Sequence, residues 1–439
     1  VSPRYASELN IGMVHQHFKL VSNYTIAENI VLGVEPQKKA LGLFPHVDMK
    51  KANREIAELS KQYGLEVDPT KVVSDLNVST RQRVEILKML YRQAEILIFD
   101  EPTAVLTPQE IDSLLKIIQN LRDGGKTIIL ITHKLDEIKK VADRCAVLRR
   151  GKLITVRDVA DVDTREMASL MVGHEVELKL EKTPARFGKE ILSVKNLTVQ
   201  NEDKFDVVKN VSFSIHEGEI FAIAGVSGNG QTEIADAIAG LLPVSSGSIS
   251  VAGEEITHQS VRKRTRSGLF SYIPEDRQNV GLILDFRLDE DLGLRRYYRE
   301  PFSHRHVLSR KQFRQYGDQL IDKYDIRSAE GNETIVRSMS GGNQQKAIVG
   351  REIEENSPLI LFVQPTRGLD IGAIDRIHRQ ILEEREKGKA ILLVSLELDE
   401  VMQLADTIGV IYGGQLNKIA PASEFTTAEV GEYMMGVKK

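Results

Sequence analysis

The feature that most constrains this chain is a long internal repeat. An apolar run at residues 96–99 leads into Asp-Glu-Pro-Thr, and a second run at 359–362 leads into Val-Gln-Pro-Thr, 263 positions later. The segments that begin at Leu76 and at Thr127 recur at the same offset. Three blocks in one register indicate a duplicated domain. The repeat is far longer than the roughly 20–50 residues of a solenoid unit, so a solenoid is excluded.

A fourth block refines the alignment of the two copies. Residues 13–16 (Met-Val-His-Gln) align with residues 272–275 (Tyr-Ile-Pro-Glu) at an offset of 259, so the second copy carries a few extra residues between this block and the next. We therefore place the first domain at residues 1–180 and the second at 191–439. A short polar linker at residues 181–190 separates them.

Both copies alternate strand-like and helical patterns. A β-branched run at residues 126–131 precedes a helical pattern at 134–142, and residues 391–395 and 397–405 repeat this order. Such alternation predicts an α/β domain with a mainly parallel sheet. Because ligands of these sheets bind at the carboxyl ends of the strands, the segments that follow the apolar runs are candidate site residues.

A glycine-rich loop in the second copy has the context of a phosphate-binding loop. A strand candidate at residues 219–224 runs into it, and a helical pattern at 233–240 follows. The spacing fits G-x-x-x-x-G-K-[ST], in which glycines let backbone N–H groups turn toward phosphate at a helix N-terminus. A glycine-rich turn without a ligand is the alternative. The candidate nucleotide-binding residues are Gly225, Ser227, Gly228, Asn229, Gly230, Gln231 and Thr232.

One residue departs from the phosphate-loop motif. Gln231 occupies the lysine position, so its amide can hydrogen-bond phosphate but adds no positive charge. Thr232 keeps the hydroxyl that is expected near Mg²⁺. For Phe205, which precedes the loop, stacking on an adenine and packing in the core are equally open.

The composition excludes several classes of protein. The 439 residues include 59 Lys and Arg against 63 Asp and Glu, a net charge of −4, which does not support a basic surface for nucleic acid. Cys145 is the only cysteine, so a disulfide framework and a cysteine-rich zinc site are excluded. No run of about 18 apolar residues occurs, and no membrane-spanning helix is predicted.

These segments together resemble the ATP-binding subunits of ATP-binding cassette (ABC) transporters. The strongest match is residues 340–346 (Ser-Gly-Gly-Asn-Gln-Gln-Lys), which resemble the signature sequence of the family. Gln16 resembles the glutamine of its Q-loop, and Asp100 with Glu101 resembles its Walker B motif. His133 resembles its switch histidine. The resemblance implies two P-loop NTPase domains in tandem, each with a helical subdomain.

Two fused copies with unequal motifs are similar to the tandem ATPases of bacterial importers for simple sugars and nucleosides. Residues 273–286 most resemble the nucleoside branch. The offset of 259 places the first copy's phosphate loop about 34 residues before Val1, in a protein on the order of 510 residues. We therefore expect a first domain without its phosphate loop, and we expect residues 1–439 alone not to hydrolyse ATP at a family-like rate.

The resemblance also implies a head-to-tail pair, in which each ATP lies between the motifs of one domain and the signature of the other. In the first composite site, Asp100 is expected to hold Mg²⁺ and Glu101 to polarise the attacking water. His133 is expected to orient the γ-phosphate, and Gln16 to contact Mg²⁺ or water and to couple to the membrane partner. The signature residues of this site are Ser340, Gly341, Gly342 and Gln344.

The second composite site lacks most of these groups. Val363 and Gln364 replace the Walker B pair, Leu396 replaces the histidine and Glu275 replaces the Q-loop glutamine. Its signature would be residues 77–80 of the first copy, which have lost both glycines. Because the losses fall on both halves of one site, we predict one hydrolytic and one degenerate site.

Simpler interpretations of single residues stay open. Asp100 and Glu101 could belong to a helix N-cap region, and His133 could be a packed or surface histidine. The sequence Ser-Gly-Gly at residue 340 could be only a turn.

The leading hypothesis is an ATPase subunit that uses ATP and Mg²⁺ to energise import of a nucleoside or simple sugar. It would bind two integral-membrane permease subunits at the cytoplasmic face of a bacterial membrane, with a substrate receptor outside. A soluble tandem ABC ATPase acting on ribosomes or nucleic acid is the alternative, because basic and aromatic residues interleave at 295–311. A solvated helical face is the favoured interpretation of that segment. A non-catalytic regulatory subunit is a third class, favoured only if Val1 is the true start.

Overall fold

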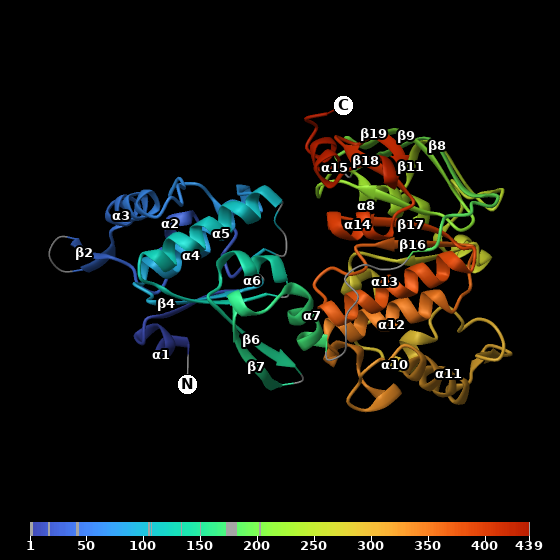
Figure 1. Cartoon of the computed structure of the whole chain (residues 1–439), viewed down its shortest axis with the longest axis horizontal. Coiled ribbons are helices and arrows are strands. Elements are labelled where there is room, and N and C mark those ends of the chain that lie inside the picture. The colour runs from blue at the N-terminus through green and yellow to red at the C-terminus, as the bar shows by residue number, and fades with distance from the viewer. Residues whose placement is uncertain are drawn as a thin grey trace. The chain divides into compact units, whose positions relative to one another are not determined.

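The structure of the chain is a computed structural model, which divides into two compact units, Val1–Val176 and Glu177–Lys439. Each unit is described by itself (Figure 1). The residues that the structure describes are 3–15, 18–40, 44–103, 106, 108–132, 134–149, 151–172, 182–201 and 203–438.

The second unit is built on a six-stranded sheet in the order β13-β16-β17-β10-β18-β19. The first five strands of this order are parallel, and β19 is antiparallel to β18. All side chains of the strands β10, β16 and β17 are buried, which explains their unbroken apolar sequences. The strands are β10 (Ile220–Ala224), β13 (Phe270–Ile273), β16 (Leu359–Val363), β17 (Ala390–Ser395), β18 (Thr407–Tyr412) and β19 (Gln415–Pro421).

A second, antiparallel sheet covers one side of this unit. Its order is β12-β11-β8-β9. Ile234 and Ile238 of α8 lie in one apolar core together with residues of both sheets, so the helix that follows the glycine-rich loop is held between them. The elements are α8 (Gln231–Ala239), β8 (Glu190–Gln200), β9 (Asp206–His216), β11 (Val244–Val251) and β12 (Glu254–Glu255).

The remaining elements of the second unit are mainly helical. Figure 1 shows α10, α11 and α12 together at the end of this unit that is remote from β8 and β9. The helices are α9 (Val261–Ser267), α10 (Leu288–Leu292), α11 (Arg310–Lys323), α12 (Gly341–Ile353), α13 (Ile371–Glu386), α14 (Leu398–Leu404) and α15 (Thr427–Met434). Short segments add a π-helical turn η3 (Arg277–Gly281), 3₁₀ turns η4 (Gly331–Glu333), η5 (Val336–Ser338) and η6 (Ala422–Glu424), and the strands β14 (Ser303–His304) and β15 (Val307–Leu308).

The first unit contains a parallel three-stranded sheet, β1-β4-β5, and two antiparallel pairs, β2-β3 and β6-β7. Its strands are β1 (Ile11–Val14), β2 (Gln37–Ala40), β3 (Phe44–Val47), β4 (Ile96–Asp100), β5 (Thr127–Ile131), β6 (Arg144–Arg149) and β7 (Lys152–Asp158). Its helices are α1 (Pro3–Glu8), α2 (Ile26–Val31), α3 (Met49–Gln62), α4 (Val78–Tyr91), α5 (Pro108–Asp123), α6 (Leu135–Val141) and α7 (Thr164–Val172), with 3₁₀ turns η1 (Val73–Asp75) and η2 (Val159–Asp161).

The two units repeat one topology. The order β1-β4-β5 matches β13-β16-β17, and the hairpin β6-β7 matches β18-β19. In the described part of the first unit no strand takes the place of β10, and Ile129 and Ile131 of β5 are each 47% exposed. The predicted α/β organisation, with a mainly parallel sheet in each copy, is confirmed.

Candidate functional site

The glycine-rich loop of the second unit joins the buried strand β10 to α8. Gly228 and Gly230 have φ values of +85° and +102°, which side chains with a Cβ rarely adopt. A Cβ on Gly230 would also lie 2.5 Å from the carbonyl oxygen of Val207. The backbone N–H groups of residues 227–230 donate to no acceptor in the described part of the chain. The loop therefore offers free donors at a helix N-terminus, the arrangement that binds phosphate.

Gln231, at the lysine position of the motif, is 2% exposed and packs into this loop. Its Nε2 donates to the carbonyl oxygen of Val226 over 2.8 Å. Its Oε1 is buried and has no hydrogen-bond partner among the described residues. The residue thus closes the base of the loop and brings no charge to it.

Thr232 is engaged by a carboxylate that the sequence assigned to the Q-loop position. The Thr232 hydroxyl donates to Glu275 Oε2 over 3.1 Å. The other oxygen of Glu275 accepts a hydrogen bond from the Arg367 guanidinium, in an ion pair. Sequence reasoning missed Arg367, although the first copy has Ala104 at the matching position, a contrast that could have singled it out.

The signature segment forms the start of α12. Ser340 is the N-cap, and its exposed hydroxyl accepts a hydrogen bond from Asn343 Nδ2 over 2.9 Å. Gly341 and Gly342 form the first turn, and their N–H groups have no acceptor in the described part of the chain. Gln344 is 3% exposed and donates to the carbonyl oxygen of Val336, so its amide anchors the helix start and does not reach solvent.

Arg277 lies beside the signature segment. Its Nη1 donates to the carbonyl oxygen of Gly341 over 3.4 Å, and no carboxylate pairs with it among the described residues. Burial and then the positive charge of Arg367 lower the pKa of this guanidinium. The charge of Asp276 opposes this lowering, but a cation without a paired carboxylate near two free N–H groups favours an anionic ligand at this surface.

The end of β4 in the first unit repeats the geometry of the end of β16. Glu101 and Gln364 both have positive φ, +44° and +51°, and their N–H groups donate to the carbonyl oxygens of Ile131 and Val394. Asp100 is half-buried, and its carboxylate has no hydrogen-bond partner in the described part of the chain. This free carboxylate at a strand end suits Mg²⁺.

The matching centre of the second unit does not suit a divalent cation. Val363 is buried and has no ligand atom, while Gln364 is 6% exposed and accepts from the N–H of Leu396 over 3.4 Å. Glu275, the carboxylate that touches Thr232, is already neutralised by Arg367. Gln16 and His133, which the sequence assigned to the first centre, lie outside the described residues.

Phe205 precedes β9 and is 70% exposed. Of the two roles that the sequence left open for it, packing in the core is therefore wrong. Val207, two positions further on, touches the last glycine of the phosphate loop. Phe205 is therefore an exposed aromatic residue two positions before a backbone contact with the loop.

The basic and aromatic segment after α10 is largely neutralised within the molecule. Arg295 pairs with Glu352 over 2.6 Å, and Arg296 and Arg299 both pair with Glu355. These arginines join the segment to the end of α12. A nucleic acid would have to displace those carboxylates.

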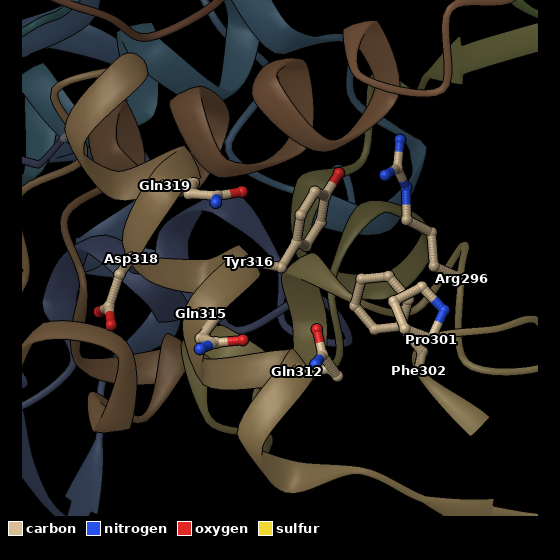
Figure 2. Close-up of a pocket in the computed structure, with 8 residues that line it drawn as sticks. All are labelled: Arg296, Pro301, Phe302, Gln312, Gln315, Tyr316, Asp318 and Gln319. Carbon is tan, nitrogen blue, oxygen red and sulfur yellow. The ribbon is translucent and has the colours of Figure 1, made fainter. Parts of the chain in front are cut away.

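The hollow shown in Figure 2 is lined partly by this same segment, including Arg296, and by none of the nucleotide-site residues described above. It has a volume of about 530 Å³ and is formed by α11 and the segment before it. The lining residues are Arg296, Pro301, Phe302, Gln312, Gln315, Tyr316, Asp318 and Gln319. None of them is a predicted site residue.

Comparison with known proteins gives one consistent result. The family model described as "ABC transporter" matches residues 3–104 and 208–367. The guanosine import ATP-binding protein NupO of Bacillus subtilis (strain 168) is 48% identical over 99% of this chain and 84% of its own length. The nucleoside import ATP-binding protein NupA of Lactococcus lactis subsp. cremoris (strain MG1363) is 46% identical over 99% and 85%. The ribose import ATP-binding protein RbsA of Corynebacterium glutamicum is 36% identical over 97% and 78%.

Proposed function

Because this chain belongs to the ABC transporter family and carries two of its ATPase domains in tandem, we propose that it energises the import of a nucleoside. Two relatives that match almost the whole chain at 46–48% identity are named as guanosine and nucleoside import proteins, whereas the ribose relative is 36% identical. Nucleosides are therefore favoured over simple sugars as the imported solute.

The observation that carries the mechanism is the contrast between two equivalent strand ends. Glu101 and Gln364 occupy the same backbone conformation, but only Glu101 is a carboxylate that can accept a proton from the attacking water. Asp100 would hold Mg²⁺, which neutralises phosphate charge, while Val363 offers no ligand. We assign hydrolysis to the first composite site and a degenerate role to the second.

The signature of the second unit completes the hydrolytic site in this proposal. The hydroxyl of Ser340 and the free N–H groups of Gly341 and Gly342 would bind the γ-phosphate, as donors at a helix N-terminus do. Gln344 would position that segment from inside through Val336. Gln16 and His133 keep their proposed roles at the metal, the attacking water and the γ-phosphate.

The import ATP-binding relatives imply membrane permease partners for this protein. Among the described residues, no helix has both the length and the apolar character to cross a bilayer. We propose that the protein binds two integral-membrane permease subunits at the cytoplasmic face of the membrane. A receptor outside the membrane would deliver the solute to them.

Two variants test this proposal. Each is expressed in a strain from which the gene for this protein has been deleted. Glu101→Gln removes the proposed base, so ATP hydrolysis and uptake of labelled guanosine should fall at least about 100-fold. Gln364→Ala, at the equivalent position, should leave both within about threefold, because it removes no proposed catalytic group. Equal losses would refute the assignment of one hydrolytic site. Normal guanosine uptake in the deletion strain would contradict the proposal that this protein energises the import of guanosine.

A further inference from the structure

At the phosphate loop of the second unit, a guanidinium lies close to the hydroxyl of Thr232, the group expected near a bound metal. Arg367 and Thr232 are joined through the two oxygens of Glu275. We propose that this loop binds a nucleoside di- or triphosphate without Mg²⁺, and that Arg367 supplies the positive charge. The proposal rests on the degenerate role assigned to this site above.

Mg²⁺ is disfavoured there by the groups that surround Thr232. Among the described residues, Glu275 is the one carboxylate that touches its hydroxyl, and a metal would have to compete with the paired guanidinium for that carboxylate. The end of β16 adds no ligand charge, because Val363 and Gln364 are neutral. Since Mg²⁺ in proteins is held by one or two carboxylates together with substrate phosphates, this centre lacks the free carboxylate it needs.

Arg367 is placed to serve a phosphate without leaving Glu275. Only its Nη1 is engaged, so Nε and Nη2 remain as donors without a partner in the described part of the chain. Its side chain is 45% exposed and can turn toward a ligand. A guanidinium that bridges a carboxylate and a phosphate combines two charge-assisted hydrogen bonds. The same group replaces the charge that Gln231 lacks at the lysine position.

The surroundings of the loop fit the rest of a nucleotide. The free N–H groups of residues 227–230 can bind the phosphates, and the exposed ring of Phe205 lies close in the chain to Val207, which touches Gly230. Gln231 Oε1 is a buried acceptor that no donor of the described residues reaches, so it calls for a further donor such as an ordered water. The free N–H groups and the exposed ring favour a ligand that carries phosphate groups as well as a nucleobase.

The test measures ATP binding to the 439-residue chain by hydrogen exchange of peptides that span residues 225–232, in excess Mg²⁺ and in excess EDTA. Because those N–H groups are free, bound phosphate should slow their exchange. The apparent Kd should be at least as low in EDTA as in Mg²⁺. Arg367→Gln should raise it about tenfold in EDTA.

The matched control is Arg337→Gln, which removes another partly exposed arginine from an ion pair with Asp285. It should leave the Kd unchanged. The proposal is overturned if ATP slows exchange of the loop only in Mg²⁺, if ATP has no effect on the loop, or if both arginine variants behave alike. Guanosine uptake and ATP hydrolysis report on the first site. A failure of the proposed function can therefore be distinguished from a failure of this proposal about the second site.

Discussion

Arg351 on the signature helix offers the sharpest test of how this helix is held. Its side chain is 8% exposed and donates to Asp291 over 2.7 Å, to Glu352 over 3.0 Å and to the carbonyl oxygen of Gly281 over 2.8 Å. Glu352 has a second cationic partner, Arg295, whereas Asp291 has none among the described residues. Replacing Arg351 by Met keeps an unbranched side chain but leaves the buried Asp291 without a cation, with the N–H of Ile283 still donating to its Oδ2 over 2.7 Å.

The expected cost follows from this geometry. Breaking a buried ion pair by removing one partner costs about 3–5 kcal/mol, and the unpaired Gly281 carbonyl adds to that cost. We therefore expect Arg351→Met to destabilise α12 by about 4 kcal/mol. The control, Arg337→Met, breaks a pair whose side chains are 59% and 80% exposed, and should cost at most about 1 kcal/mol.

Hydrogen exchange of the amides of α12 is the appropriate assay. The chain has no Trp and two units, so a single global transition would mix them. Equal losses of protection in the two variants would refute the reasoning. So would an Arg351→Met variant whose loss of protection is independent of pH.

The pH dependence has a defined sign. Burial already raises the pKa of Asp291 in the native chain, against the opposing effect of Arg351. In Arg351→Met the folded-state pKa should rise further, above that of the unfolded chain. The penalty is then full above the folded pKa and shrinks as the pH falls through it, so lowering the pH from neutral should restore protection of α12. The double variant Arg351→Met with Asp291→Asn should show no such recovery.

Two further predictions concern the same region. Gly350→Ala should destabilise the protein by about 1–3 kcal/mol in thermal unfolding, because the new methyl would lie 2.8 Å from the Tyr324 ring, whereas the same change at Gly431, with open space around it, should be neutral or stabilising. Burial raises the pKa of Asp325, but hydrogen bonds from Arg376 and a neighbouring lysine outweigh it and lower the pKa to about 2. Asp325→Asn should therefore cost about 1 kcal/mol at neutral pH, a modest value for a half-exposed group, and the difference in Tm should vanish as the pH falls through 2.

The fold could be predicted because its signals are local or repeat along the chain. The helical pattern at residues 397–405 became α14 (Leu398–Leu404), and the strand candidate at 219–224 became β10 (Ile220–Ala224). Buried parallel strands read as continuous apolar runs, and the glycine-rich loop between strand and helix is a local motif. The duplication then fixed the order of elements in both units.

The side-chain partners could not be predicted, because they come from distant parts of the chain. Arg367 and Glu275 are 92 positions apart, and no periodicity connects them. The arginines after α10 gave a pattern typical of nucleic-acid binding, but the structure pairs them with Glu352 and Glu355, more than 50 positions away. Sequence shows which charges are present, and only the fold decides which of them neutralise one another.

Comparison of the two units also distinguishes residues that hold the site in shape from residues that carry its chemistry. Thr103 donates to Glu137 in the first unit, and Thr366 donates to Glu400 in the second, and all four residues are buried. This bond ties the segment after β4 or β16 to the helix that follows the neighbouring strand, α6 or α14, and it is present in both copies although the neighbouring carboxylates are not. On our assignment the second unit must stay rigid because its α12 completes the hydrolytic site. On the same assignment, we expect the loss of catalytic groups there to leave activity unchanged and the loss of its packing to lower activity.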